Sequence, residues 1–111
     1  MKADIAVARL AALAQDTRLG IFRLLVQKGP DGLCAGDIQT KLKLAPATLS
    51  FHLKELTRAG LLKPRQDGRF VFYAPDIGAM NALVDYLTEK CCSGSSCAIA
   101  CAPTKLQTKA A

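Results

Sequence analysis

Apolar residues recur every three or four positions through the first half of the chain, the spacing of amphipathic helices. The spacing predicts helices over residues 3–14, from a cap at Asp16 or Thr17 to about residue 28, over 35–42 and over 46–58. The apolar positions that define them are Val7, Leu10, Ala11, Leu13, Leu19, Phe22, Leu25, Val26, Ile38, Leu42, Leu49, Leu53 and Leu56. Breaker residues near the predicted ends are Gly29, Pro30, Pro46 and Gly60.

From residue 61 the pattern becomes that of short strands. Residues 61–65 and 70–74 predict two strands, and the Asp67-Gly68 pair between them is typical of a hairpin turn. A last helix then begins at about Asp76, with an apolar stripe of Ile77, Met80, Leu83, Val84 and Leu87. Two short helices followed by a hairpin give the order helix, turn, helix, wing. The sequence therefore predicts a mainly α fold with a β-hairpin wing, the winged helix-turn-helix.

The second helix of this motif, residues 46–58, divides into an apolar and a polar face. Such a division suits a recognition helix, which needs a rigid apolar back and directs hydroxyl or basic groups into the major groove of DNA. Thr48 and Ser50 are candidate base or phosphate contacts, and Lys54 and Arg58 are candidate phosphate contacts. We expect the DNA-contacting residues to be Thr48, Ser50, Phe51, His52, Lys54, Arg58, Arg65 and Arg69.

Three members of this set have less obvious roles. Arg65 and Arg69 lie on either side of the predicted hairpin tip, from which they can reach the DNA backbone or the adjacent minor groove. His52 is the one histidine of the chain. We expect it at the boundary between the helix and DNA, or between the helix and the core, and not in a metal site.

The net charge of +6 is concentrated around this motif. Residues 41–70 carry seven basic and two acidic side chains, a balance of +5, whereas residues 1–40 balance to +1. Concentrated basic charge is typical of a polyanion partner, although on charge alone a merely solvated basic face is equally expected. The motif within the basic stretch favours double-stranded DNA as the partner.

The chain of 111 residues accommodates one domain, which we place at residues 1–90. No apolar run approaches the ~20 residues of a membrane span, so we expect no membrane partner. The N-terminus has Asp4 and Arg9 within an Ala/Leu pattern and lacks the layout of a signal peptide. We therefore expect a cytoplasmic protein with reduced thiols.

Residues 49–62, LSFHLKELTRAGLL, followed by residues 65–73, RQDGRFVFY, resemble the ArsR/SmtB family of metal-responsive repressors. Residues 12–19, ALAQDTRL, resemble that family's entry into its second helix. The resemblance covers about residues 5–92. It implies a homodimer whose first and last helices form the interface, bound to an operator of two-fold symmetry with half-sites ~34 Å apart.

Four of the five cysteines lie within eleven residues of a tail that we place at residues 91–111: Cys91, Cys92, Cys97 and Cys101. The Ser/Gly sequence of residues 93–96 allows Cys97 to approach the adjacent pair, so that three thiolates surround one centre even without Cys101. All-sulfur ligation selects thiophilic ions. Three sulfurs suit As(III) or Sb(III), and four also suit tetrahedral zinc or cadmium.

The resemblance separates these alternatives. Zinc-sensing relatives carry paired histidines and carboxylates on the last helix, where this chain has Asp76, Asp85 and Glu89 but no histidine. Arsenic-responsive relatives can carry a cysteine pair ahead of the third helix, but here Cys34 is followed by Gly36 at the second place, and we expect Cys34 to be a small hydrophobic residue. Others carry cysteines at the end of the last helix. The resemblance thus implies a repressor that releases its operator when As(III) or Sb(III) binds Cys91, Cys92, Cys97 and Cys101.

Other readings of the cysteines remain open. Cadmium, lead or another soft metal, or a redox or sulfide signal, are alternatives for the same fold, as is a tail without a regulatory role. A cysteine-tail metal buffer or chaperone is an alternative of another class, but it leaves the basic charge and the helix order unexplained. A thiol enzyme needs a nucleophile of low pKa in a structured positive pocket, which the Ser/Gly tail does not predict. We therefore expect neither an enzyme nor a catalytic cofactor.

Overall fold

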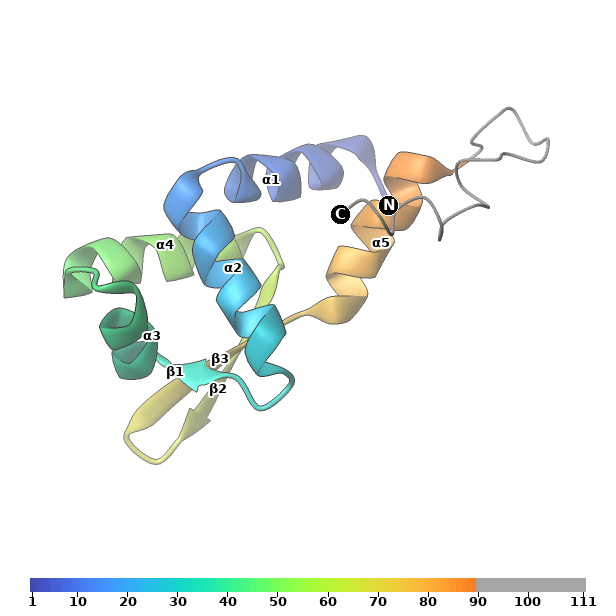
Figure 1. The fold of residues 1–111 in the computed structure, drawn as a ribbon. Coiled ribbons are helices and arrows are strands. Elements are labelled where there is room, and N and C mark those ends of the chain that lie inside the picture. The colour runs from blue at the N-terminus through green and yellow to red at the C-terminus, as the bar shows by residue number, and fades with distance from the viewer. Residues whose placement is uncertain (90–111) are drawn as a thin grey trace, which may run out of the picture.

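In the computed structural model, which describes residues 1–89, helices and a small sheet enclose one leucine-rich core (Figure 1). The helices are α1 (Ala3–Leu13), α2 (Asp16–Lys28), α3 (Ala35–Leu42), α4 (Pro46–Arg58) and α5 (Ile77–Thr88). The strands are β1 (Leu33–Cys34), β2 (Leu62–Asp67) and β3 (Phe70–Pro75). This is the predicted winged helix-turn-helix, with α3 and α4 as the two helices of the motif and β2–β3 as the wing.

The sheet has one strand more than the sequence analysis predicted. Its order is β1-β3-β2, all antiparallel, and Leu33 pairs with Tyr73. A strand as short as β1 has no periodicity from which to predict it. β1 can approach β3 this closely because Gly32, the residue before β1, has φ +75° and no side chain. A Cβ added at Gly32 would lie 2.4 Å from the Tyr73 carbonyl oxygen.

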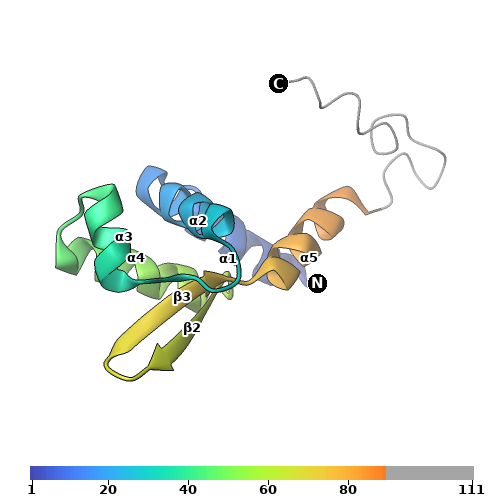
Figure 2. The same cartoon turned by 60° about the horizontal axis from the view of Figure 1, so that its bottom comes forward.

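The hairpin of β2 and β3 projects from the helices as a free wing (Figure 2). Asp67 pairs with Phe70, so the loop has two residues, and its first residue, Gly68, has φ +64°. Glycine at this position is typical of tight hairpin loops. The hairpin is where the sequence predicts it, but its loop is Gly68-Arg69 and not the Asp67-Gly68 pair, because Asp67 is the last residue of β2. Pro64 lies in β2, an edge strand of the sheet, where a residue without an N–H is tolerated.

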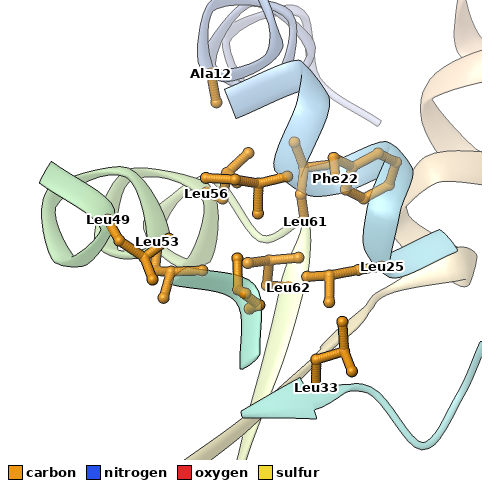
Figure 3. Packing of buried hydrophobic residues seen from close by; sticks show 11 residues of the cluster. Ala12, Phe22, Leu25, Leu33, Leu49, Leu53, Leu56, Leu61 and Leu62 are labelled. Atoms are coloured by element: carbon orange, nitrogen blue, oxygen red, sulfur yellow. The ribbon is translucent and has the colours of Figure 1, made fainter. Parts of the chain in front are cut away.

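The core is formed by the inward faces of α2 and α4 and by the leucines that follow α4 (Figure 3). The side chains of Ile21, Leu25, Ile38, Leu56 and Leu61 are completely buried. Side chains of this size each gain about 1.5–3 kcal/mol from burial, so this cluster fixes how α4 lies against α2 and α3. The start of α2 differs from the expectation, because the Gln15 side chain, and not Asp16 or Thr17, accepts the capping hydrogen bond.

The predicted apolar stripes of α1 and α5 lie largely outside this core. On α1 the buried residues are Ala6 and Ala12, whereas Val7 is 63% exposed. On α5, Ala79 and Leu83 are buried, and Ile77, Val84 and Leu87 are exposed. The N-terminal end of α1 lies beside α5, remote from the tip of the hairpin (Figures 1 and 2). No helix within residues 1–89 is both long and apolar enough to cross a bilayer.

Candidate nucleic-acid interface

The recognition helix α4 has the two faces that its sequence predicts. Leu49, Leu53 and Leu56 are buried, and Pro46 occupies its first turn, where a missing N–H costs nothing. The opposite face is exposed and comprises Thr48, Ser50, Phe51, Lys54 and Arg58. At about 100° per residue, Phe51, Lys54 and Arg58 fall within roughly 60° of arc and form the centre of this face.

The end of α4 is fixed by the backbone. Gly60 has φ +85°, the Gly60 N–H donates to the Thr57 carbonyl at 3.0 Å, and the Leu61 N–H donates to the Leu56 carbonyl at 3.0 Å. These two bonds form a Schellman motif, which turns the chain sharply out of the helix. Since β2 begins at Leu62, the wing is held at a defined angle to the recognition helix.

A hollow of about 430 Å³ separates α4 from the wing. Its lining residues are Ser50, Lys54, Thr57, Arg58, Pro64 and Tyr73. Lys54 and Arg58 bring two cationic side chains to one side of it, the Arg58 guanidinium donating also to the Glu55 carboxylate, and Ser50 and Tyr73 bring hydroxyl groups. Its chemistry therefore suits an anion such as a phosphate, which would share Arg58 with Glu55 or displace it. Thr57, Pro64 and Tyr73 were not among the predicted contacts, because only the fold brings the wing against α4.

The two wing arginines lie in different surroundings. Arg65 is held along the hairpin: its guanidinium lies 4.9 Å from the centre of the Phe72 ring, donates to the Asp31 carbonyl at 3.1 Å and lies 3.7 Å from Asp67. Arg69 is exposed in the hairpin loop. The Arg69 guanidinium can therefore extend from the tip of the wing toward DNA. The Arg65 guanidinium can do so only after breaking its contacts with Phe72, Asp31 and Asp67.

His52 lies on the core side of α4 and not on its exposed face. It is 8% exposed, and its Nδ1 lies 3.3 Å from the Nη1 of Arg18, whose Nε donates to the Ala12 carbonyl at 2.7 Å. Burial and, secondly, the neighbouring Arg18 charge lower the pKa of His52 below its usual 6.5. Of the two expected positions, the structure selects the boundary between helix and core, and we therefore remove His52 from the DNA-contacting set.

The other candidate ligands are placed as follows. Asp76 accepts a hydrogen bond from the Ala79 N–H and caps α5, which accounts for its carboxylate. Cys34 is half-buried with a free thiol, rather than fully buried, and immediately precedes α3. Residues 1–89 contain no cluster of three or more metal-ligating side chains. The predicted ligands Cys91, Cys92, Cys97 and Cys101 lie outside the described residues.

Comparison with known proteins gives this geometry a family context. A family model described as a helix-turn-helix domain matches residues 13–65. The transcriptional activator HlyU of Vibrio cholerae is 31% identical over 90 residues, covering 81% of each chain. A solved structure of HlyU is similar with a TM-score of 0.64 and 32% identity, covering 83% of this chain and 99% of HlyU.

Two further relatives point the same way. The arsenical resistance operon repressor of Escherichia coli is 35% identical over 102 residues, covering 76% of this chain and 86% of that repressor. The homodimeric winged helix-turn-helix DNA-binding domain of Mb0332 from Mycobacterium bovis, a possible ArsR-family regulator, is similar with a TM-score of 0.62 and 29% identity, covering 78% of this chain and 81% of that one. With the fold, the exposed face of α4 and these similarities together, the chain belongs to the ArsR family of winged helix-turn-helix transcriptional regulators.

Proposed function

We propose that this protein is a homodimeric repressor that binds operator DNA and releases it when As(III) or Sb(III) binds the cysteines of its C-terminal tail. The observation that carries the DNA-binding part is the exposed face of α4, where Ser50, Lys54 and Arg58 line a hollow shared with the wing. Seven of the fifteen lysines and arginines lie in residues 41–70, which include α4 and most of the hairpin. Neutralising phosphates with cations supplies a large share of the affinity of such proteins for DNA.

The homodimer is supported by the outward apolar residues of α1 and α5. Val7, Leu10, Val84 and Leu87 are each more than 40% exposed in the single chain. Pairing these two helices with those of a second copy would bury these side chains, and each copy would then present one α4 to DNA. The Mycobacterium bovis relative is described as homodimeric, which agrees with this assembly.

The inducer is proposed from the chemistry of the tail and from one relative. Cys91, Cys92 and Cys97, with Cys101 as a possible fourth ligand, offer sulfur donors alone, and trivalent arsenic and antimony are thiophilic. The Escherichia coli relative is named for arsenical resistance, which supports an arsenical, whereas the CadC homolog of Staphylococcus aureus, 35% identical over 74 residues, is named for cadmium resistance and keeps cadmium as the alternative. A repressor acting on DNA in the cytoplasm would keep these thiols reduced and ready to bind.

The proposed release is a coupling between two sites. Binding of the ion displaces protons from the thiols and orders the segment that follows α5. If the bound form favours a dimer geometry that fits DNA poorly, operator affinity falls. A coupling free energy of about 1–3 kcal/mol corresponds to a reduction of roughly 5–150-fold.

The test is operator binding, measured by fluorescence anisotropy with labelled DNA from upstream of the protein's own gene. Arsenite, cadmium and zinc are titrated separately in reducing buffer. Release by arsenite alone supports the proposal, whereas release by cadmium or zinc alone assigns the repressor to another metal. Absence of salt-dependent DNA binding would refute the repressor itself. Since HlyU is named an activator, a reporter gene must also show lower transcription when the protein is present.

Serine variants of the tail cysteines test the inducer site. Cys91→Ser and Cys92→Ser should each bind the operator with unchanged affinity but no longer release it with arsenite, because each removes one thiolate from the proposed site. Cys34→Ser is the matched control, since Cys34 precedes α3 and should leave release intact. Normal release by both tail variants, or loss of release in Cys34→Ser alone, would move the site away from the tail.

A further inference from the structure

Arg9 lies in the middle of the inward stripe of α1. The buried residues of this helix, Ala6 and Ala12, are three positions before and after it, and residues three apart share a helix face. Arg9 is itself half-buried, although charged side chains usually face solvent. Its inward position therefore calls for partners inside the domain.

Those partners are carbonyl oxygens of two elements distant in sequence. The Arg9 Nε donates to the Ala59 carbonyl at 3.2 Å, and its Nη1 donates to the Ala79 carbonyl at 3.2 Å. Ala59 is the C-cap of α4, and Ala79 lies in the first turn of α5. The Arg9 guanidinium also borders the glycine that ends α4, since a Cβ added at Gly60 would lie 3.2 Å from Nη2. One side chain thus joins α1, α4 and α5.

The chemistry of this junction suits arginine specifically. The last carbonyl groups of a helix lack partners within the helix and carry partial negative charge, so a cation at the end of α4 is favourable. A guanidinium presents several N–H groups in a rigid plane and can donate to two carbonyls at once. A lysine ammonium keeps the charge but not this planar fork.

We propose that Arg9 is a positioning residue for DNA binding, which sets the direction of the recognition helix relative to the layer of α1 and α5 without touching DNA. This rests on the proposed function, in which α1 and α5 form the dimer and α4 enters the groove. α1 contacts both α5 and α4, so it helps to fix their relative placement, together with the Asp76 N–H that donates to the Leu61 carbonyl at 2.8 Å. In a dimer, a small change in this direction changes the separation of the two α4 helices, and the half-sites of DNA tolerate little change.

The experiment compares Arg9→Gln and Arg9→Lys with the wild-type full chain in operator binding over a range of salt concentrations. Both variants should bind about tenfold more weakly, equivalent to roughly 1.4 kcal/mol. The dependence of log affinity on log salt should keep the wild-type slope, because Arg9 neutralises no phosphate. Arg58→Gln serves as the opposite case, since losing a phosphate contact should reduce the slope by about 0.9 per protomer. Arg23→Gln, the same change at an exposed position of α2, should alter neither quantity.

Several results would overturn the proposal. If Arg9→Gln or Arg9→Lys binds the operator with wild-type affinity, the two hydrogen bonds of the Arg9 guanidinium are not needed for DNA binding. A slope reduced as in Arg58→Gln would place Arg9 on a phosphate, and a monomeric Arg9→Gln in sedimentation would place its effect in assembly. Should Arg9→Gln unfold at the assay temperature, the lysine variant, which retains the charge, decides alone. Failure of the wild type to bind DNA would instead refute the proposed function.

Discussion

Arg18 and His52 illustrate how a polar pair can be placed within a mostly apolar core. Arg18 donates to the carbonyl of Ala12 near the end of α1 and lies 3.3 Å from the His52 ring nitrogen on α4. The nitrogen facing Arg18 must act as an acceptor, so the imidazole is neutral in this arrangement. A proton on that nitrogen would oppose the arginine and break the contact.

The pH dependence of stability follows from this pair. The pKa of His52 is lowered by folding, so between its folded value and its unfolded value near 6.5 the unfolded chain binds the extra proton. The contribution of His52 is therefore fully present above pH 6.5 and is lost as the pH falls through that window. We expect the free energy of unfolding to fall more between pH 7.5 and pH 5 in the wild type than in His52→Gln. Urea denaturation at both pH values measures this, and equal decreases would contradict the placement of His52.

At the scale of elements, the pairing of β1 and the angle between α4 and the wing depend on backbone conformation and not on the pattern of side chains. β1 can pair with β3 because the residue before β1 is Gly32, which has no side chain to collide with the Tyr73 carbonyl oxygen. In the same way, Gly60 ends α4 and directs β2 toward the wing. Both glycines have positive φ, a conformation that is costly for residues with a side chain. The angle between recognition helix and wing therefore depends on a few backbone positions.

Two glycine-to-alanine changes should consequently have opposite effects. Gly32→Ala combines φ +75° with a Cβ only 2.4 Å from the Tyr73 oxygen, and we expect it to destabilise the fold by at least about 1–3 kcal/mol. Gly20→Ala, inside α2 with nothing within 4 Å of the added Cβ, should stabilise by about 0.5–1 kcal/mol. Thermal denaturation of both variants gives the comparison. A neutral Gly32→Ala would mean that the β1–β3 pairing adds nothing to stability.

At the scale of the whole molecule, two kinds of surface lie on different elements. The exposed apolar side chains of α1 and α5 form one, and the basic and polar face of α4 with the wing forms the other. Arg9 and Arg18 link the two through α1, by hydrogen bonds to Ala59, Ala79 and Ala12 and by the His52 contact. In the proposed dimer, contacts at the apolar surface of α1 and α5 would therefore influence the position of the basic face of α4.

Charge introduced into the apolar surface should separate the copies. Val7→Glu and Leu87→Glu each place a carboxylate where we propose that two copies meet, and an unpaired buried charge is strongly unfavourable. We expect both variants to sediment as monomers and to bind the operator more weakly, because each α4 then binds without its partner. Val26→Glu is the control: Val26 is 42% exposed but lies on α2. A dimeric Val7→Glu together with a dimeric Leu87→Glu would place the interface elsewhere.

Much of this protein was predictable from local sequence signals. The helices, the hairpin with its turn near Gly68 and the division of α4 into two faces follow from hydrophobic period and turn chemistry, which act over a few residues. The exposed Thr48, Ser50, Lys54 and Arg58 are where that division places them. Because each helix within residues 1–89 has a local signal in the sequence, the fold class followed from the order of the elements.

Contacts between distant segments were decided only by the tertiary structure. Nothing local distinguishes Arg9 from a surface arginine, yet packing of α1 turns it toward carbonyls 50 and 70 residues away. His52 was assigned to a boundary that the sequence left open, and its burial against Arg18 resolved it. The strand β1 and the participation of Tyr73 in the hollow likewise depend on which segments meet. Such positions depend on contacts between distant segments of the domain, and the free energy of these contacts cannot be estimated from any short stretch of sequence.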